Sequence, residues 1–255
     1  MVNNQFALIL GGTTGLGFAS VKKLAAEGFN IIVVHRTRKA DLVQFQEFIN
    51  TTNVTVIEFA TDALNPEKRE DCIQHLVETL PKHSVKLMLH SIAKGNLNPL
   101  VNSEKTLSSK DYQLTINAMG TSLLDWSQAM LNANLFSDHA KILAFTSEGN
   151  TKVIPNYGAV SAAKVVLESI IKQMAVEFAP FQITANAIQA GVTDTTSLRM
   201  IPGSDKLKSL ALQRNPNNRL TKPEDVANAV YLLSKDEANW ITGNIIKVDG
   251  GEHLR

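Results

Sequence analysis

The sequence predicts a single α/β domain in which helices cover both faces of a parallel sheet of about seven strands. Short runs rich in Val, Ile and Phe alternate along the chain with helical patterns. These runs are almost continuously apolar, which is typical of parallel strands buried on both faces and indicates a doubly wound, Rossmann-type sheet. The expected strands are Gln5–Leu10, Asn30–His35, Val54–Phe59, Val85–His90, Ala140–Thr146, Gln182–Ile188 and Asn244–Val248.

Local signals place the helices between these strands. A glycine-rich segment leads from the first strand into a helix expected over Phe18–Glu27, and a later helix begins at Tyr157. The later helix carries an apolar stripe of Leu167, Ile170, Ile171 and Met174. N-cap signals start three further helices: Asn65 with Pro66, Ser108 with Asp111, and Thr221 with Glu224. Because neither a repeat nor a linker interrupts the pattern, we expect one domain over residues 1–255.

Residues 192–220 form the exception, because Pro202, Gly203 and Pro216 break any long period. We expect a loop with short helical pieces. Its apolar side chains would suit a lid over a greasy substrate, and an ordinary surface loop explains the pattern equally well. These side chains are Leu198, Met200, Ile201, Leu207, Leu210 and Leu212.

Composition excludes several classes of partner. The 25 Lys and Arg against 24 Asp and Glu give no electrostatic case for nucleic acid or an anionic membrane. Residues 1–5 lack the pattern of a signal peptide, and no run approaches about 18 apolar residues, so we expect a soluble, cytoplasmic protein. Cys72 is the only cysteine, which excludes an internal disulfide, and the histidines lack metal-ligand spacing.

The glycines at the first strand-to-helix turn predict a dinucleotide site. Their spacing is Gly-x3-Gly-x-Gly, and glycine permits a tight turn and close approach of the backbone to a pyrophosphate. Free N–H groups at the start of the helix would meet the phosphate charge. The residues expected to contact the cofactor here are Gly11, Thr13, Thr14, Gly15, Leu16 and Gly17.

The end of the second strand bears on which nicotinamide is bound. NAD sites commonly place an acid there, but this chain has no acid before Asp41 and carries Arg36 and Arg38 instead. Guanidinium groups match a ribose phosphate, so the segment favours NADPH over NADH, unless these bases are simply a solvated turn. Asp62, after the third strand, either touches the adenine or caps a helix.

Tyr157 and Lys164 are the main candidates for chemistry. Seven residues are two helical turns, so both side chains would share one face about 10 Å apart along the axis. Beside a nicotinamide, Tyr can donate a proton and Lys can anchor the cofactor. Tyr231 and Lys235 show the shorter Tyr-x3-Lys spacing, which we interpret as a helix end at the surface. We interpret His90, which closes a buried strand, as a hydrogen-bonded structural residue.

The ordered set of motifs resembles the short-chain dehydrogenase/reductase family along nearly the whole chain. The matching segments are Gly11–Gly17, Asp62, His90–Ala93, Asn117, Tyr157 with Lys164, Asn186–Gly191, Pro223–Ala227, Ile241–Gly243 and Val248–Gly251. Most members carry Asn-Asn-Ala-Gly where this chain has His90–Ala93, and Tyr-x3-Lys where it has Tyr-x6-Lys. Both departures are similar to the enoyl-acyl-carrier-protein reductases. Many of these enzymes have a second Tyr at the position of Ser147.

The resemblance implies the remaining site residues, an NAD(P)H cofactor, a role in fatty acid synthesis and a homotetramer. The implied catalytic residues are Tyr157, Lys164, Ser147 and Asn117. The further implied cofactor contacts are Asp62, Ala63, Ser91, Ile92, Ala93, Lys164, Gly191, Val192, Thr193 and Thr195.

The longer spacing has a chemical rationale. An enoyl thioester takes hydride at its β-carbon while charge develops on the carbonyl oxygen, so the proton donor must lie further from the nicotinamide than in a ketone reductase. We hypothesise that Tyr157 binds the enolate oxygen with help from Ser147, while Lys164 binds the ribose and lowers the pKa of the Tyr. A 3-oxoacyl reductase and a catalytically inactive NADPH sensor are the alternatives.

An acyl carrier protein is the expected bearer of the substrate. Such carriers are acidic, and cations outnumber the acids Asp194 and Asp205 in the lid segment, so that charge would steer the carrier to it. A solvated loop explains the same charges. The cations are Arg199, Lys206, Lys208, Arg214 and Arg219.

Overall fold

The computed structural model describes residues 5–101 and 104–255. Seven parallel strands form one sheet in the order β3-β2-β1-β4-β5-β6-β7, which confirms the predicted fold class. The strands are β1 Phe6–Leu10, β2 Asn30–His35, β3 Val56–Ala60, β4 Val85–His90, β5 Phe136–Thr146, β6 Thr184–Ala190 and β7 Ile245–Val248. Strand β5 starts earlier than predicted, because Phe136 pairs with Val85 before a register shift.

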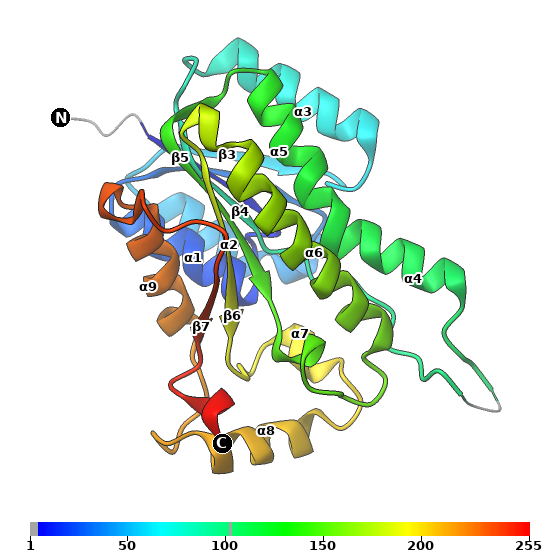
Figure 1. Ribbon diagram of the computed structural model, residues 1–255. Coiled ribbons are helices and arrows are strands. Elements are labelled where there is room, and N and C mark those ends of the chain that lie inside the picture. The colour runs from blue at the N-terminus through cyan, green and yellow to red at the C-terminus, as the bar shows by residue number, and fades with distance from the viewer. Residues whose placement is uncertain (1–4, 102–103) are drawn as a thin grey trace.

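Helices cover both faces of the sheet (Figure 1). One face carries α1 Gly15–Ala26, α2 Val43–Thr51 and α9 Pro223–Ser234. The other face carries α3 Pro66–Thr79, α5 Ser122–Asn132 and α6 Gly158–Glu177. Short segments complete the chain: α4 Ser109–Ile116, α7 Thr196–Arg199, α8 Ser204–Arg214, the π-helix η2 Asn117–Thr121, and the 3-10 turns η1 Lys39–Asp41, η3 Glu148–Asn150, η4 Ala179–Phe181, η5 Asp236–Ala238 and η6 Glu252–Leu254.

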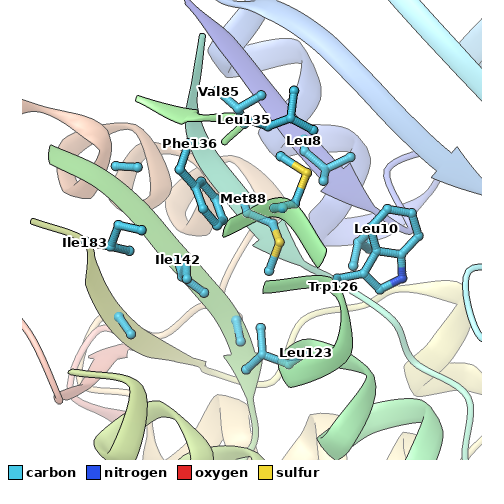
Figure 2. Packing of buried hydrophobic residues seen from close by; sticks show 14 of the residues in the cluster. Leu8, Leu10, Val85, Met88, Leu123, Trp126, Leu135, Phe136, Ile142 and Ile183 are labelled. Atoms are coloured by element: carbon cyan, nitrogen blue, oxygen red, sulfur yellow. The ribbon is translucent and has the colours of Figure 1, made fainter. Parts of the chain in front are cut away.

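Alternating side chains of each strand fill two separate cores. Leu8 and Leu10 of β1 point to the face covered by α5, where they pack with Trp126 (Figure 2). Ala7 and Ile9 of the same strand point to the other face. Because both faces of each central strand are buried, the strands had to be apolar at nearly every position, which is the pattern that the sequence shows.

Two of the three predicted caps are confirmed. The Asn65 side chain accepts a hydrogen bond from the Lys68 N–H at 3.1 Å, and Ser108 forms a capping box with Asp111. The cap predicted at Thr221 is wrong: α9 has Lys222 as its N-cap. The Thr221 backbone instead pairs with Thr193, outside the named strands.

Within residues 5–101 and 104–255, no helix combines the length and apolar character needed to cross a membrane. The same ranges contain no cluster of three metal-ligating side chains. The prediction about a signal peptide rests largely on residues 1–4, which lie outside the described residues. Cys72 is buried and free, as a small packing residue of the core.

Candidate active site

The carboxyl end of β1 forms a cradle in which glycine is sterically required. Gly11 has φ +85°, and a Cβ there would lie 2.8 Å from the Ser91 carbonyl oxygen at the end of β4. A Cβ on Gly17 would lie 2.3 Å from the Gly11 carbonyl oxygen, so only glycine lets α1 start this close to the loop. Helix α1 has no acid in its first turn, which leaves its N–H groups available for an anion. The cradle therefore fits a dinucleotide pyrophosphate.

A cavity of about 320 Å³ opens at this point, where the strand order reverses between β1 and β4. Such a switch point is where doubly wound sheets bind nucleotides. The sequence-predicted residues that line it are Gly11, Thr13, Thr14, Gly15, Leu16, Arg36, Asp62, Ala63, Ser91, Ile92, Ala93, Ser147, Tyr157, Lys164 and Thr195. Gly17 lies behind the loop instead. Within the described residues, Arg38 lines neither this cavity nor the larger apolar cavity that adjoins it.

Arg36 and Asp62 face each other at the edge of the cavity. The Arg36 Nη1 lies 3.3 Å from the Asp62 carboxylate, and both side chains are partly exposed. An exposed pair of this kind is weak, so Arg36 can exchange this carboxylate for a ligand phosphate at little cost. Of the two arginines predicted at the end of β2, Arg36 is the one placed to do so.

The chemical groups converge between β5 and the start of α6. Tyr157 is the N-cap of α6, and its hydroxyl donates a hydrogen bond to the Ser147 Oγ at 3.3 Å. The buried Lys164 ammonium donates to the Phe145 carbonyl oxygen at 2.7 Å. Both side chains line the nucleotide cavity, so the structure brings Ser147, Tyr157 and Lys164 to one wall.

Burial shifts the pKa values of both groups. It lowers the pKa of Lys164 to about 8, and the nearby Glu168 opposes this change. Burial raises the pKa of Tyr157, while the hydrogen bond to Ser147 acts in the opposite direction. The net shift of the Tyr157 pKa is therefore upward, opposite to the direction expected from Lys164, because desolvation of the phenol is the largest effect. At neutral pH Tyr157 keeps the proton that a donor needs.

Glu168 is a site residue that the sequence analysis missed. Its Oε1 accepts a hydrogen bond from the Thr146 hydroxyl at 2.5 Å and another from the Asn150 amide. This carboxylate thus joins α6 to both sides of Ser147. It stands one helical turn after Lys164, and helical i, i+4 spacing was the available signal.

Gly149 is a second missed residue. A Cβ at this position would lie 2.5 Å from Cε1 and 2.6 Å from Cδ1 of Tyr157. The bare glycine backbone therefore provides the surface on which the phenol ring rests. A buried glycine eight residues before the Tyr carried no motif that pointed to this contact.

A second cavity of about 700 Å³ continues from the first. The two share Ser147 and Tyr157 in their walls. Most of the apolar lining comes from residues 198–210 and from the segment before Tyr157, with further side chains from the loop after β4 and from α6: Leu198, Met200, Ile201, Leu207, Leu210, Val153, Ile154, Leu97 and Val160. Gly191, Val192 and Thr193, predicted as cofactor contacts, line this second cavity instead of the first. Leu212 points to solvent and is not part of the lining.

The cations of residues 192–220 are largely paired with neighbouring carboxylates. Arg199 binds Asp194 at 2.9 Å, and Lys208 lies 2.8 Å from Asp205. The other two pairs are Arg219 with Asp225 at 2.6 Å and Arg214 with Glu252 at 2.8 Å. This pairing reduces the positive field that the sequence predicted on the lid.

Comparison with known proteins places this geometry in a family. A family model described as enoyl-(acyl carrier protein) reductase matches residues 11–253. The chain belongs to the short-chain dehydrogenase/reductase family. It is accordingly an NAD(P)H-dependent oxidoreductase.

Relatives within this family carry names for different substrates. A 1-cyclohexenylcarbonyl-CoA reductase of Streptomyces collinus is 29% identical over 97% of this chain and 86% of its own length. An enoyl-acyl-carrier-protein reductase (NADH) of Enterococcus faecalis is 25% identical over 99% of both chains. A 3-oxoacyl-acyl-carrier-protein reductase of Mycobacterium bovis is 24% identical over 97% of this chain and 92% of its own.

The fold agrees with solved structures of short-chain dehydrogenase/reductases. The enoyl-acyl-carrier-protein reductase (NADH) of Aquifex aeolicus superposes with a TM-score of 0.87 at 23% identity, covering 100% of this chain and 98% of that chain. At this identity the similarity supports the architecture alone.

Other residues singled out as short-chain dehydrogenase/reductase features lie apart from the cavity walls. Asn117 starts the π-helix between α4 and α5, and its amide oxygen accepts from the Thr121 hydroxyl at 3.4 Å. His90 is fully buried with its Nε2 2.8 Å from the Ser122 Oγ, and burial lowers its pKa to about 3, which confirms a structural role. Lys235 contacts the Tyr231 ring at the end of α9, away from both cavities.

Proposed function

We propose that this chain reduces a 2-enoyl thioester with NADPH, as an enoyl-acyl-carrier-protein reductase of fatty acid synthesis. The observation that carries the proposal is the position of the Tyr157 hydroxyl. It lies on the wall shared by the nucleotide cavity and the apolar cavity, 3.3 Å from the Ser147 Oγ. A thioester carbonyl bound there would leave its acyl chain among the apolar lid residues.

The first cavity has the features that a nicotinamide dinucleotide requires. The glycine cradle and the start of α1 suit the pyrophosphate, and Arg36 would hold a 2′-phosphate, which favours NADPH over NADH. Lys164 would bind the nicotinamide ribose. When bound, the cofactor supplies a hydride to the β-carbon of the substrate.

The residues of this chain would handle the charge that develops on the substrate. Tyr157 keeps its proton at neutral pH and would donate it toward the enolate oxygen, and the Ser147 hydroxyl would bind the same oxygen. The Lys164 cation would add positive charge behind the phenol. The apolar lining would exclude water from the reacting carbons.

A 3-oxoacyl thioester is the second candidate substrate. The direct hydrogen bond between Tyr157 and Ser147 favours it, because the same two groups could polarise the ketone oxygen. In that reaction the donor and the hydride acceptor carbon belong to one carbonyl group, whereas in the enoyl reaction they are separated along the conjugated system.

The test is NADPH oxidation by the purified protein with crotonyl and acetoacetyl thioesters side by side, repeated with Tyr157→Phe. We expect turnover of crotonyl thioester that falls at least about tenfold in the variant, since a hydrogen bond to a charged group contributes about 1.5–3 kcal/mol. Turnover of acetoacetyl thioester alone would select the 3-oxoacyl reductase. Bound NADPH without turnover of either substrate would contradict both and select the inactive sensor.

We also propose acyl carrier protein as the bearer of the substrate, a homotetramer and a cytoplasmic location. Exposed apolar side chains on α6 and near the carboxyl terminus support assembly, among them Val165, Val176 and Trp240, which is 97% exposed. Sedimentation equilibrium should then give a mass about four times that of the chain; a monomer would refute it.

Lys206 is the lid cation best placed for docking of an acyl carrier protein, because it is exposed and the other four lid cations bind nearby carboxylates.

A further inference from the structure

The carboxylate of Glu252, three residues before Arg255, contacts both ends of residues 192–214 of the lid segment. Its Oε2 accepts a hydrogen bond from the Val192 N–H at 3.1 Å, where the lid segment begins. Its Oε1 accepts from the Arg214 Nη2 at 2.8 Å, at the last residue of α8. The Glu252 side chain is only 3% exposed. One buried carboxylate therefore joins the two ends of the segment that covers the apolar cavity.

Arg214 also contacts the loop of residues 147–152, which we call the catalytic loop because it begins at Ser147. The same Nη2 also donates to the Glu148 Oε2 at 3.1 Å, and Glu148 directly follows Ser147. Lys152 holds the other Glu148 oxygen at 2.6 Å. Arg214, Glu148 and Glu252 all line the apolar cavity. The ion pairs thus run along the cavity wall from the lid to Glu148, the sequence neighbour of the residue that binds the Tyr157 hydroxyl.

The surroundings of Arg214 show which parts this link joins. The Asn215 amide donates to the Asp249 carbonyl oxygen at 2.9 Å, and the Asn217 amide donates to the Gly250 carbonyl oxygen at 2.9 Å. The chain just after α8 is therefore fixed to the carboxyl-terminal segment independently of Arg214. Figure 1 shows α8 beside that segment, below the strand ends.

Burying these charges has a free-energy cost, which makes the contact informative. Burial raises the pKa of Glu252, and the Val192 N–H and Arg214 oppose that change. Arg214 shares one nitrogen between two carboxylates and keeps its buried Nε without a hydrogen-bond partner in the described part of the chain. Apolar side chains at positions 214, 148 and 252 together would avoid this cost, whereas removing the arginine alone leaves the buried Glu252 without its cation, so stability alone does not explain the charged set.

We propose that Arg214 is a positioning residue that ties helix α8 to the catalytic loop through Glu148 and to the chain terminus through Glu252. These two contacts, which we call the tie, hold the α8 side of the apolar cavity at a fixed distance from Ser147. Because Asn215 and Asn217 still fix the chain after α8, removing the tie loosens α8 itself against the loop of Ser147, and this misplaces the thioester without affecting the nucleotide cavity. The kinetic consequence rests on the proposed function, whereas the effect on α8 does not.

The experiment compares Arg214→Met with Arg69→Met by hydrogen exchange and by steady-state kinetics. Arg69 is the matched control, since it forms an ion pair with Asp125 at 3.4 Å and is 19% exposed, against 26% for Arg214, but lies on α3. In Arg214→Met we expect faster amide exchange across residues 204–214, kcat/KM for crotonyl thioester lower by at least about tenfold, and an unchanged Kd for NADPH. Arg69→Met should change none of these.

Glu148→Gln tests the link to the catalytic loop if Arg214→Met does not fold. It keeps the size of the side chain and leaves the contact between Arg214 and Glu252, so kcat should fall while α8 exchange rises only slightly. In the double variant the two kinetic losses should be less than additive, because both break one link. Unchanged exchange and kinetics in Arg214→Met, or fully additive losses, would overturn the proposal. If the native protein turns over neither thioester, the proposed function fails. Amide exchange in Arg214→Met against Arg69→Met then decides by itself whether Arg214 holds α8 in place.

Discussion

Replacing Gly149 with Ala should displace the Tyr157 ring and reduce turnover far more than it reduces stability. The added Cβ would lie 2.5 Å from Tyr157 Cε1, whereas carbon atoms in contact are separated by about 3.5–4.0 Å. The ring must therefore withdraw by roughly 1 Å, and its hydroxyl moves away from Ser147. A misplacement of about 1 Å can cost roughly a hundredfold in rate, whereas overpacking costs about 1–3 kcal/mol of stability.

The assay measures kcat for the preferred thioester, the NADPH dissociation constant and the thermal midpoint of Gly149→Ala. Gly243→Ala is the control, because position 243 has φ +75°, lies outside both cavity linings and should lose about 1–2 kcal/mol from backbone strain without a loss of kcat. We expect Gly149→Ala to bind NADPH normally and to lose about a hundredfold in kcat. A kcat within about threefold of the native value would refute the inference that Gly149 positions the phenol.

Two further predictions concern charge. The pKa of Lys164 is lowered to about 8, so kcat/KM should be level below that pH and fall as the pH rises through it, while Tyr157, with its raised pKa, stays protonated. Glu168→Gln removes a carboxylate that raises the pKa of Lys164 and should move this decline to lower pH; an unmoved profile would assign it to another group. Arg36→Ala should raise the KM for NADPH by roughly 10- to 100-fold and leave that for NADH nearly unchanged, and equal effects on both cofactors would exclude a 2′-phosphate contact.

The sheet could be predicted because its determinants are local in sequence. Each central strand needed an apolar run to satisfy two cores, and the turn after β1 needed glycine, so local sequence patterns marked both. The cap of α9 was misplaced because Thr221 has a long-range partner, Thr193, which its sequence neighbours do not reveal.

The environment of Tyr157 could not be read in the same way. Its pKa depends on how deeply the phenol is buried, and that follows from side chains of several segments. Gly149 acts through a contact that no motif spacing describes, and the helical spacing of Glu168 from Lys164 does not reveal its contacts with Thr146 and Asn150. The sequence named the candidate groups, and the structure was needed to show what holds them in place.

The two cavities differ in how their specificity is encoded, and this explains why the substrate is harder to assign than the fold. The nucleotide cavity is formed by backbone at the ends of β1 and β4, so its glycines persist as a readable motif. The apolar cavity is lined mostly by side chains from residues 93–97, 146–160, 189–214 and 249–252, which meet only in three dimensions. One fold can host different substrates, and relatives of 24–29% identity carry names for enoyl, 3-oxoacyl and cyclohexenylcarbonyl substrates. The contact of Arg214 with Glu148 and Glu252 lies in the wall of the apolar cavity, so we expect the determinants of the substrate to lie around it rather than around the glycine loop.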